Sequence, residues 1–209
     1  MRSIWIICWL CCFTAKGEAQ NCWRFGLQSG LTATTFTTDV TIFNTFTTSL
    51  PAPISFDYDP TVNFHLGAWL ERPVGERLAL RWEVQRSPGG AMSFDAAEQR
   101  KQRYKFFYLS SPMVLQIAPN RSRRIQLEGG VVANFFMFDY GEEIYAGDQN
   151  NFEYSYLVGL NIQLGAKWQA HVRYQSGQSA FSELESTNVQ ANTYNRLLAL
   201  SFSRLLIEF

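Results

Sequence analysis

The stretch Arg77–Arg86, RLALRWEVQR, alternates between apolar and polar residues along most of its length. Side chains of a β-strand point to opposite faces with a period of two, so the apolar residues share one face: Leu78, Leu80, Trp82 and Val84. Arg81 and Glu83 lie on the opposite face. In a soluble sheet the apolar face is the core, whereas in a membrane barrel it meets lipid and the charges point inward. The fold and the function depend on which of these two arrangements holds.

The composition suits one β-rich domain or one barrel. The chain has 209 residues, and its 18 basic and 18 acidic residues give a formal net charge of zero. This balance favours no nucleic-acid partner. Aromatic residues make up 15% of the chain, and the mean hydropathy is −0.14. No run after the N-terminus is long and apolar enough to predict a transmembrane helix.

Residues 1–20 are typical of a signal peptide. Arg2 supplies the positive charge, and Ile4–Phe13, IWIICWLCCF, is an apolar run that is too short to span a bilayer. Cleavage is expected after Ala19 or Gln20, which leaves residues 21–209 as the mature domain. Cys22 would then be the one cysteine of the mature chain, so no disulfide is expected within it. The alternative is that the apolar run forms a buried N-terminal helix or strand.

Eight segments have the two-residue period of a strand, and no segment has a convincing helical period. The predicted strands span residues 24–36, 62–71, 77–86, 104–117, 124–138, 153–164, 168–175 and 194–209. Most have about 10 to 14 residues, which is longer than the ~5–6 of an average strand and close to the ~9–11 that cross a bilayer at a tilt. The segment 95–105, DAAEQRKQRYK, is polar, and we interpret it as part of a loop.

The connections between these strands alternate in length. Long loops are predicted at residues 37–61, 87–103, 139–152 and 176–193, and they alternate with short turns at 72–77, at 118–123 and around Gly165. Membrane barrels have short turns at one end and long loops at the other. We therefore predict an all-β fold, an eight-stranded antiparallel up-and-down transmembrane β-barrel. For the Thr- and Phe-rich tract 32–49, which enters the loop 37–61, an extension of the first hairpin that binds partners is the alternative to a flexible outer loop.

Several motifs, taken in order, resemble those of one family. They are FGLQSGL at 25–31, FHLGAWLERPVGERLALRWEVQRS at 64–87, YLSSPMVLQIAPNRSRRIQLEGGVVANF at 108–135, YLVGLNIQLGAKWQAHVRYQSGQSAF at 156–181 and NRLLALSFSR at 195–204. Together they resemble PorT-like outer-membrane β-barrel proteins of the kind common in Bacteroidetes. The resemblance implies an eight-stranded barrel in the outer membrane and transfers no catalytic residue. One group of that family acts in type IX protein secretion.

The charged residues of the inward phase predict a filled lumen, because an eight-stranded barrel is just wide enough for side chains to fill it. Buried charges must be paired. We therefore expect a structural polar network in place of an open channel, formed by Arg81, Glu83, Glu128, Arg173, His65 and His171. A catalytic site made of a histidine and a carboxylate is the alternative interpretation of these residues.

No other pattern predicts catalysis, a cofactor or a metal. The acidic segment 141–153, GEEIYAGDQNNFE, lacks the spacing of an EF-hand, and we interpret it as a solvated loop. We expect an outer-membrane protein of the Gram-negative envelope that is in contact with lipid. It would have a structural or interaction role through its long loops and would not be an enzyme. The alternatives are a part of a secretion machine and a secreted, soluble, lipocalin-like barrel that binds a small apolar ligand.

Overall fold

The computed structural model describes residues 22–42, 54–95, 100–139, 148–149, 151–180, 182–186 and 189–209. The predicted signal peptide and most of the acidic segment 141–153 lie outside these residues. The strands are β1 (Arg24–Ile42), β2 (Ile54–Asp57), β3 (Asp59–Pro73), β4 (Leu78–Asp95), β5 (Arg100–Ile117), β6 (Ile125–Asp139), β7 (Asp148–Gln149), β8 (Phe152–Gln163), β9 (Trp168–Gly177), β10 (Ser182–Ser186) and β11 (Val189–Glu208). Within the described ranges, no helix is long and apolar enough to cross a membrane.

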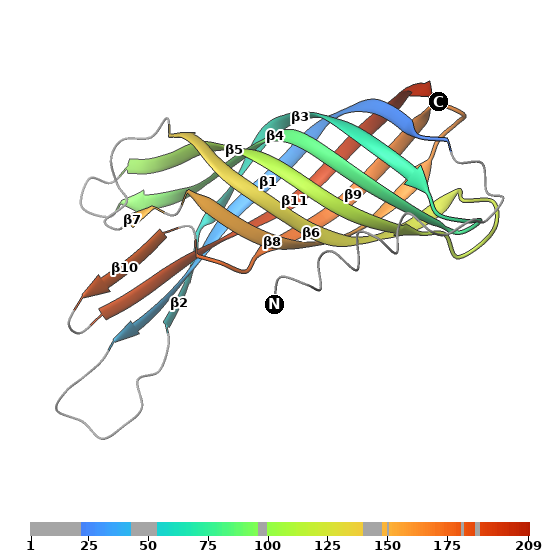
Figure 1. The fold of residues 1–209 in the computed structure, drawn as a ribbon. Helices are drawn as coiled ribbons and strands as arrows, with labels where there is room; N and C mark the ends of the chain where they lie inside the picture. Colours follow the sequence, from blue (N-terminus) through green and yellow to red (C-terminus); the bar gives the residue numbers. More distant parts are fainter. Residues whose placement is uncertain are drawn as a thin grey trace.

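Eight long strands close into an antiparallel barrel (Figure 1). Sequential neighbours pair all the way round, in the order β1, β3, β4, β5, β6, β8, β9 and β11, and β1 pairs with β11 to close the ring. Both ends of the described chain lie at the end with the short turns, where the backbones of Trp23 and Phe209 are hydrogen-bonded to each other. We call this end the turn end and the opposite one the outer end. The predicted fold class is confirmed.

Hydrophobic side chains cover the outside of the barrel, while polar side chains fill the inside. In β4, Leu78, Leu80, Trp82 and Val84 are exposed, whereas Arg81 and Glu83 are buried. Exposed leucine, valine, isoleucine and aromatic side chains continue in the same phase on the other barrel strands. A soluble protein shows the reverse arrangement, and a barrel that spans a bilayer shows this one. The apolar face of RLALRWEVQR therefore faces outward.

The strands continue beyond the barrel at the outer end, where the sequence predicted loops. β1 extends to Ile42 and pairs there with β2 on one side and with β11 on the other. β10 adds to β11, and β7 adds to β10. The result is a projecting sheet with the order β2, β1, β11, β10, β7 (Figure 1). The described part of loop 37–61 is therefore largely a strand extension, in agreement with the alternative of an extended hairpin.

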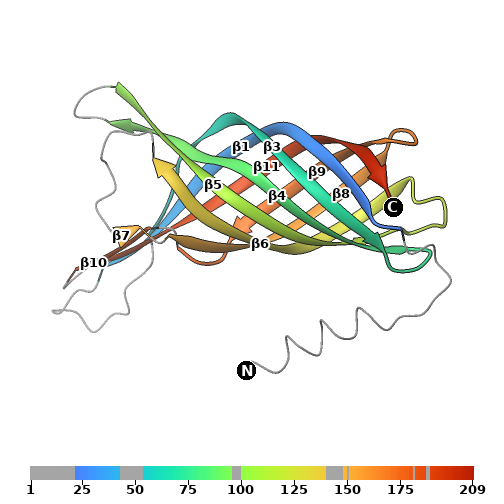
Figure 2. The ribbon, with the colours of Figure 1, turned by 45° about the horizontal axis from the view of Figure 1, so that its top comes forward.

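The predicted loop 87–103 is also wrong in its extent. β4 continues to Asp95, β5 begins at Arg100, and the two pair without a shift up to that point. This hairpin forms a second extension, separate from the projecting sheet (Figure 2). The predicted loops 139–152 and 176–193 likewise contain the short strands β7 and β10 and the first residues of β11. Residues such as Pro88 and Gly89 signal a turn, but the neighbouring strand supplies a continuous partner for pairing.

Candidate functional site

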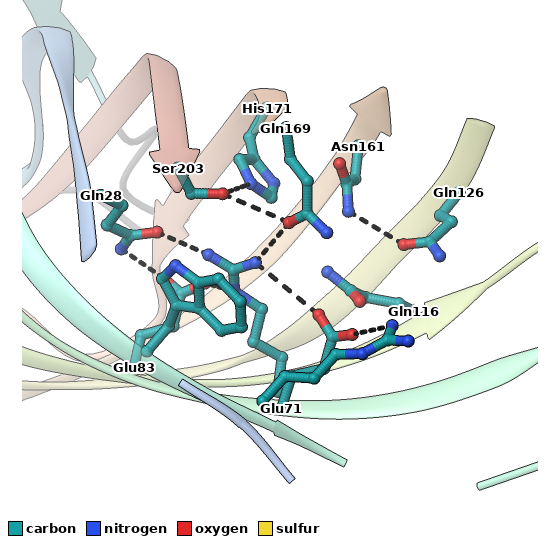
Figure 3. Close-up of polar contacts among 12 residues, drawn as sticks. Gln28, Glu71, Glu83, Gln116, Gln126, Asn161, Gln169, His171 and Ser203 are labelled. Carbon is teal, nitrogen blue, oxygen red and sulfur yellow. Dashed lines mark hydrogen bonds and ion pairs between the residues drawn. The ribbon is translucent and has the colours of Figure 1, made fainter. Parts of the chain in front are cut away.

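The turn half of the lumen holds a charged network of side chains from five strands. Arg81 and Glu83 come from β4, Glu128 from β6, and His171 and Arg173 from β9, and each occupies an inward position. All five are almost completely buried. Figure 3 shows Gln28 from β1 and Ser203 from β11 reaching into the same region. We call these seven residues, together with Gln169 of β9, the lumen network.

Arg173 is the centre of the lumen network. Its Nη1 and Nη2 donate to the two carboxylate oxygens of Glu83 at 2.7 and 2.8 Å. Its Nε and Nη2 donate to the two carboxylate oxygens of Glu128 at 2.6 and 3.0 Å. Both carboxylates are thus bound in a bidentate manner, the strongest geometry for this kind of pair. Gly159 on the neighbouring strand makes room, because a Cβ there would lie 2.8 Å from the Cγ of Arg173.

Arg81 extends the lumen network toward the turn end. Its Nε donates to Glu83 at 2.6 Å, its Nη1 to Gln169 at 2.8 Å and its Nη2 to Gln28 at 3.0 Å. Its guanidinium lies 4.2 Å from the ring centre of Trp69, within the range of a cation–π contact. All the donor nitrogens of this buried arginine therefore have partners, which compensates the cost of removing the charge from water.

His171 joins the charged part of the network to its neutral part. Its Nδ1 lies 3.1 Å from a carboxylate oxygen of Glu128, and its Nε2 lies 2.9 Å from the hydroxyl of Ser203. That hydroxyl also lies 3.2 Å from the Oε1 of Gln169, which leads back to Arg81 (Figure 3). A carboxylate only accepts hydrogen bonds, so Nδ1 donates to Glu128. His171 thus acts as an oriented link within a closed ring of contacts.

His65 lies apart from the lumen network. Its side chain is buried, and its Nδ1 has no hydrogen-bond partner. It lines a small interior cavity together with Arg173 and Gln175. The cavity has a volume of about 10 Å³, which is roughly the minimum for one water molecule. Five of the six residues predicted for the polar network are therefore brought together by direct contacts, and His65 is not.

The outer half of the lumen is filled differently. Phe36, Ala91, Phe106 and Tyr108 form a buried cluster, with Phe136 and Tyr58 packed against it. We call these six residues the aromatic cluster. The hydroxyl of Tyr108, a member of this cluster, donates to Glu153 at 2.8 Å. The sequence did not predict this cluster, nor did it predict the neutral members Gln28, Gln169 and Ser203 of the lumen network. For these three polar residues, the inward position in the two-residue period was the available signal.

The charged side chains of the lumen network bind one another. Each carboxylate of the lumen network is bound by arginine, and His171 is held on both ring nitrogens. Glu128, His171 and Ser203 are each at most 5% exposed, so a substrate could reach them only if the packing of the lumen opened. No group of three potential ligands for a metal ion occurs among the residues that the structure describes. The geometry is therefore that of a packed polar core.

The arrangement defines a class of fold, the eight-stranded barrel with an apolar exterior and a filled polar lumen. No protein-family model matches the chain, and no curated protein matches it in sequence. Solved structures do match. The chain is similar to Neisserial surface protein A (NspA), with a TM-score of 0.52 and 10% identity, over 87% of this chain and 97% of that one.

A second similar structure is the outer membrane protein OprG from Pseudomonas aeruginosa. The TM-score is 0.51 and the identity 9%, over 89% of this chain and 97% of that protein. Because these identities are low, the similarity shows the fold, which is that of small outer-membrane β-barrels.

Proposed function

We propose that this protein is a plugged outer-membrane barrel that acts as a structural or interaction protein through the strands projecting from its outer end. The observation that carries the proposal is the contrast between the filled lumen and the projecting sheet. Arg173 alone binds two carboxylates across the lumen, and the interior cavity beside it has room for about one water. Among the residues that the structure describes, these side chains fill the lumen, and we infer that the protein acts through its outer surface and not by conducting a solute.

The apolar exterior supports the outer-membrane location and opposes the soluble, lipocalin-like alternative. A carrier of apolar ligands needs an apolar lumen, and here Arg81, Glu83 and Glu128 occupy it. In membrane barrels the short turns lie in the periplasm and the longer connections outside the cell. We therefore assign the turn end to the periplasm and the projecting sheet to the cell exterior. Residues 1–20 would serve as the cleaved signal peptide for export.

The projecting sheet supports an interaction role because, among the described residues, its two edge strands have a partner on one side only. β2 forms one edge and β7 the other. An exposed edge strand offers unpaired backbone groups to which a partner can add a strand. The Thr-rich sequence of β1 between Phe36 and Ile42 contains a single charged residue, Asp39. A protein partner that binds this segment would therefore meet little charge repulsion.

The resemblance to PorT-like barrels supports a second candidate, a component of a type IX-like secretion machine. A barrel with a filled lumen and a projecting sheet is better suited to hold other proteins of such a machine together than to form its pore. The discriminating experiment compares the secreted proteins of cells with and without this gene product. Loss of secreted proteins from the medium, with the outer membrane intact, supports this candidate, and an unchanged set of secreted proteins rejects it.

The main proposal is tested in two steps. Outer membranes are purified, and the protein is examined for a folded band whose gel mobility changes on boiling. Next, a photo-crosslinking residue is placed at Val40 in the projecting sheet and, as the matched control, at Val158 in the apolar exterior. We expect protein adducts from position 40 and lipid adducts from position 158. Absence from the outer membrane, or the same adducts at both positions, contradicts the proposal.

A further inference from the structure

A polar cavity lies at the turn end of the barrel, at the mouth of the lumen. It has a volume of about 270 Å³. The charged side chains that line it are Arg24, Glu76, Arg121, Arg123 and Glu208. Arg24 points inward, because its Nη1 lies 3.5 Å from the carboxylate of Glu71, a buried residue of the lumen. This mouth cavity therefore faces the water at the end of the barrel and not the lipid around it.

Arg123 is fixed beside the mouth cavity by the neighbouring turn. Its Nε donates to the carbonyl of Glu76 at 2.8 Å, and its Nη2 donates to the carbonyls of Gly75 and Leu78. The backbone of Arg123 has a φ of 50°, in the left-handed region that residues other than glycine seldom adopt. Such a conformation persists where the surrounding contacts hold it in place. The guanidinium is therefore held in position, and these bonds leave its Nη1 unused.

The turn end is strongly basic, although the whole chain has no net charge. Eight basic and three acidic residues, a surplus of five positive charges, lie within residues 22–24, 71–79, 117–126, 163–169 and 204–209. A surface on which one sign of charge dominates raises the local concentration of ligands of the opposite sign. The mouth cavity is therefore placed where an anionic group in the surrounding water collects.

The arginines of the mouth cavity keep N–H groups for such a ligand. Arg24 pairs with Glu208 at 2.9 Å and Arg121 pairs with Glu76 at 3.1 Å, in each case through Nε. Among the described residues, no partner contacts the Nη1 of Arg123 or the two Nη atoms of Arg121. Partial burial and the charge of Arg24 lower the pKa of Arg123, so the two cations lie close enough for one anion to relieve their repulsion. Guanidinium edges bind the paired oxygens of a carboxylate.

We propose that the mouth cavity binds an acidic side chain from a peptide segment of a periplasmic partner. The inference concerns the end of the barrel opposite to the projecting sheet, and it rests on the proposed function only for the periplasmic location. Arg121 and Arg123 bind the carboxylate, and the basic turn end attracts further acidic residues of the segment. The volume lies below the ~300–1,000 Å³ of pockets for drug-sized molecules, so it suits a single side chain. Glu76 and Glu208 weigh against the double charge of a phosphate.

The test measures, by fluorescence anisotropy in detergent, how tightly the purified, folded protein binds a short peptide of glutamates with blocked ends. A glutamine peptide of the same length and inorganic phosphate are measured in parallel. We expect Arg123→Gln to weaken binding of the glutamate peptide about fivefold or more, since it loses charge-assisted hydrogen bonds. Arg121→Gln, which keeps the bonds between Arg123 and the neighbouring turn, should weaken binding by a smaller factor. The matched control is Arg204→Gln, which removes the same charge from the turn end but faces outward over the ring of Trp168.

The outcomes separate this inference from the proposed function. Weaker binding by Arg123→Gln and Arg121→Gln, with Arg204→Gln like the wild type, supports the site when the heat-dependent gel mobility shows that all three variants are folded. An equal loss in Arg204→Gln overturns it, because binding would then depend only on the total charge of the turn end. Absence of binding, equal binding of the glutamine peptide, or tighter binding of inorganic phosphate also overturns it. None of these results bears on the projecting sheet, which crosslinking from position 40 tests independently.

Discussion

At the turn end of the lumen, Arg173 is enclosed by two carboxylates, whereas at the outer end Phe106 is enclosed by aromatic rings. The ring centre of Phe106 lies 5.6 Å from that of Phe36 and 5.0 Å from that of Tyr108. Both arrangements fill the same barrel, but a substitution destabilises each of them for a different physical reason. A charge network depends on every partner being present, whereas an aromatic cluster depends on shape and volume. The substitutions below are chosen to expose that difference.

The largest effect is expected for Arg173→Met in the lumen network. The substitution leaves Glu83 and Glu128 buried with fewer partners, and breaking a buried pair in this way costs about 4 kcal/mol of the free energy of unfolding. Denaturant unfolding in detergent or lipid vesicles measures the loss. The matched control, Arg173→Met combined with Glu128→Gln, removes the one stranded charge, because Glu83 keeps its pair with Arg81, and it should recover most of the loss. A loss below about 1 kcal/mol in the single variant contradicts a structural role for these charges.

A slightly smaller effect is expected for Phe106→Ala in the aromatic cluster. The substitution removes a buried ring and leaves a cavity, which costs about 3 kcal/mol in a packed core. Phe106→Leu keeps most of the volume and should cost less than about 1.5 kcal/mol. The same unfolding assay compares the two. If leucine were as damaging as alanine, stacking geometry and not volume would be the property that matters at the outer end.

Gly89→Ala tests how closely the outer end is packed. A Cβ at Gly89 would overlap the ring of Phe106, so one added methyl group forces the cluster apart. Overpacking of this kind costs about 2 kcal/mol. The cost should fall in the double variant Gly89→Ala with Phe106→Leu, because the two positions share one space and their effects are then not additive. Strict additivity in this cycle would show that the added methyl group does not press on Phe106.

The sequence predicted the barrel well because lipid imposes one rule on every spanning strand. Leu78, Trp82 and Val84 all face outward, and this requirement produces the two-residue period that is visible in the sequence. The strand extensions at the outer end are not subject to this requirement, so their sequence has no comparable pattern. Residues 87–90, Ser-Pro-Gly-Gly, contain the residues of a turn, and only the continuous register with β5 shows that β4 passes through them.

Inward positions could be predicted from the sequence where they hold a charged residue, but not where they hold an apolar or neutral one. A charged residue between apolar neighbours, such as Arg81 or Glu128, reveals an inward position without any knowledge of its partners. Phe106 and Tyr108 lie beside Phe107 and Leu109, so both faces of that strand are apolar and its phase is ambiguous. The partners of Arg81 include Gln169, which is distant in sequence, and its contact depends on how the strands are staggered around the barrel.

The smallest effect is expected for Glu76→Gln, which removes an ion pair of the same chemistry from the surface of the turn end. Arg121 lies 3.1 Å from Glu76, but their side chains are 79% and 71% exposed, whereas Glu83 beneath them is fully buried. Water and salt screen an exposed pair, so we expect a change of about 0.5 kcal/mol or less at low salt and a smaller change at high salt. Unfolding measured at low and high salt provides the check. A loss comparable to that of Arg173→Met would mean that arginine–carboxylate pairs stabilise this barrel wherever they lie, and that burial is not what distinguishes the lumen network.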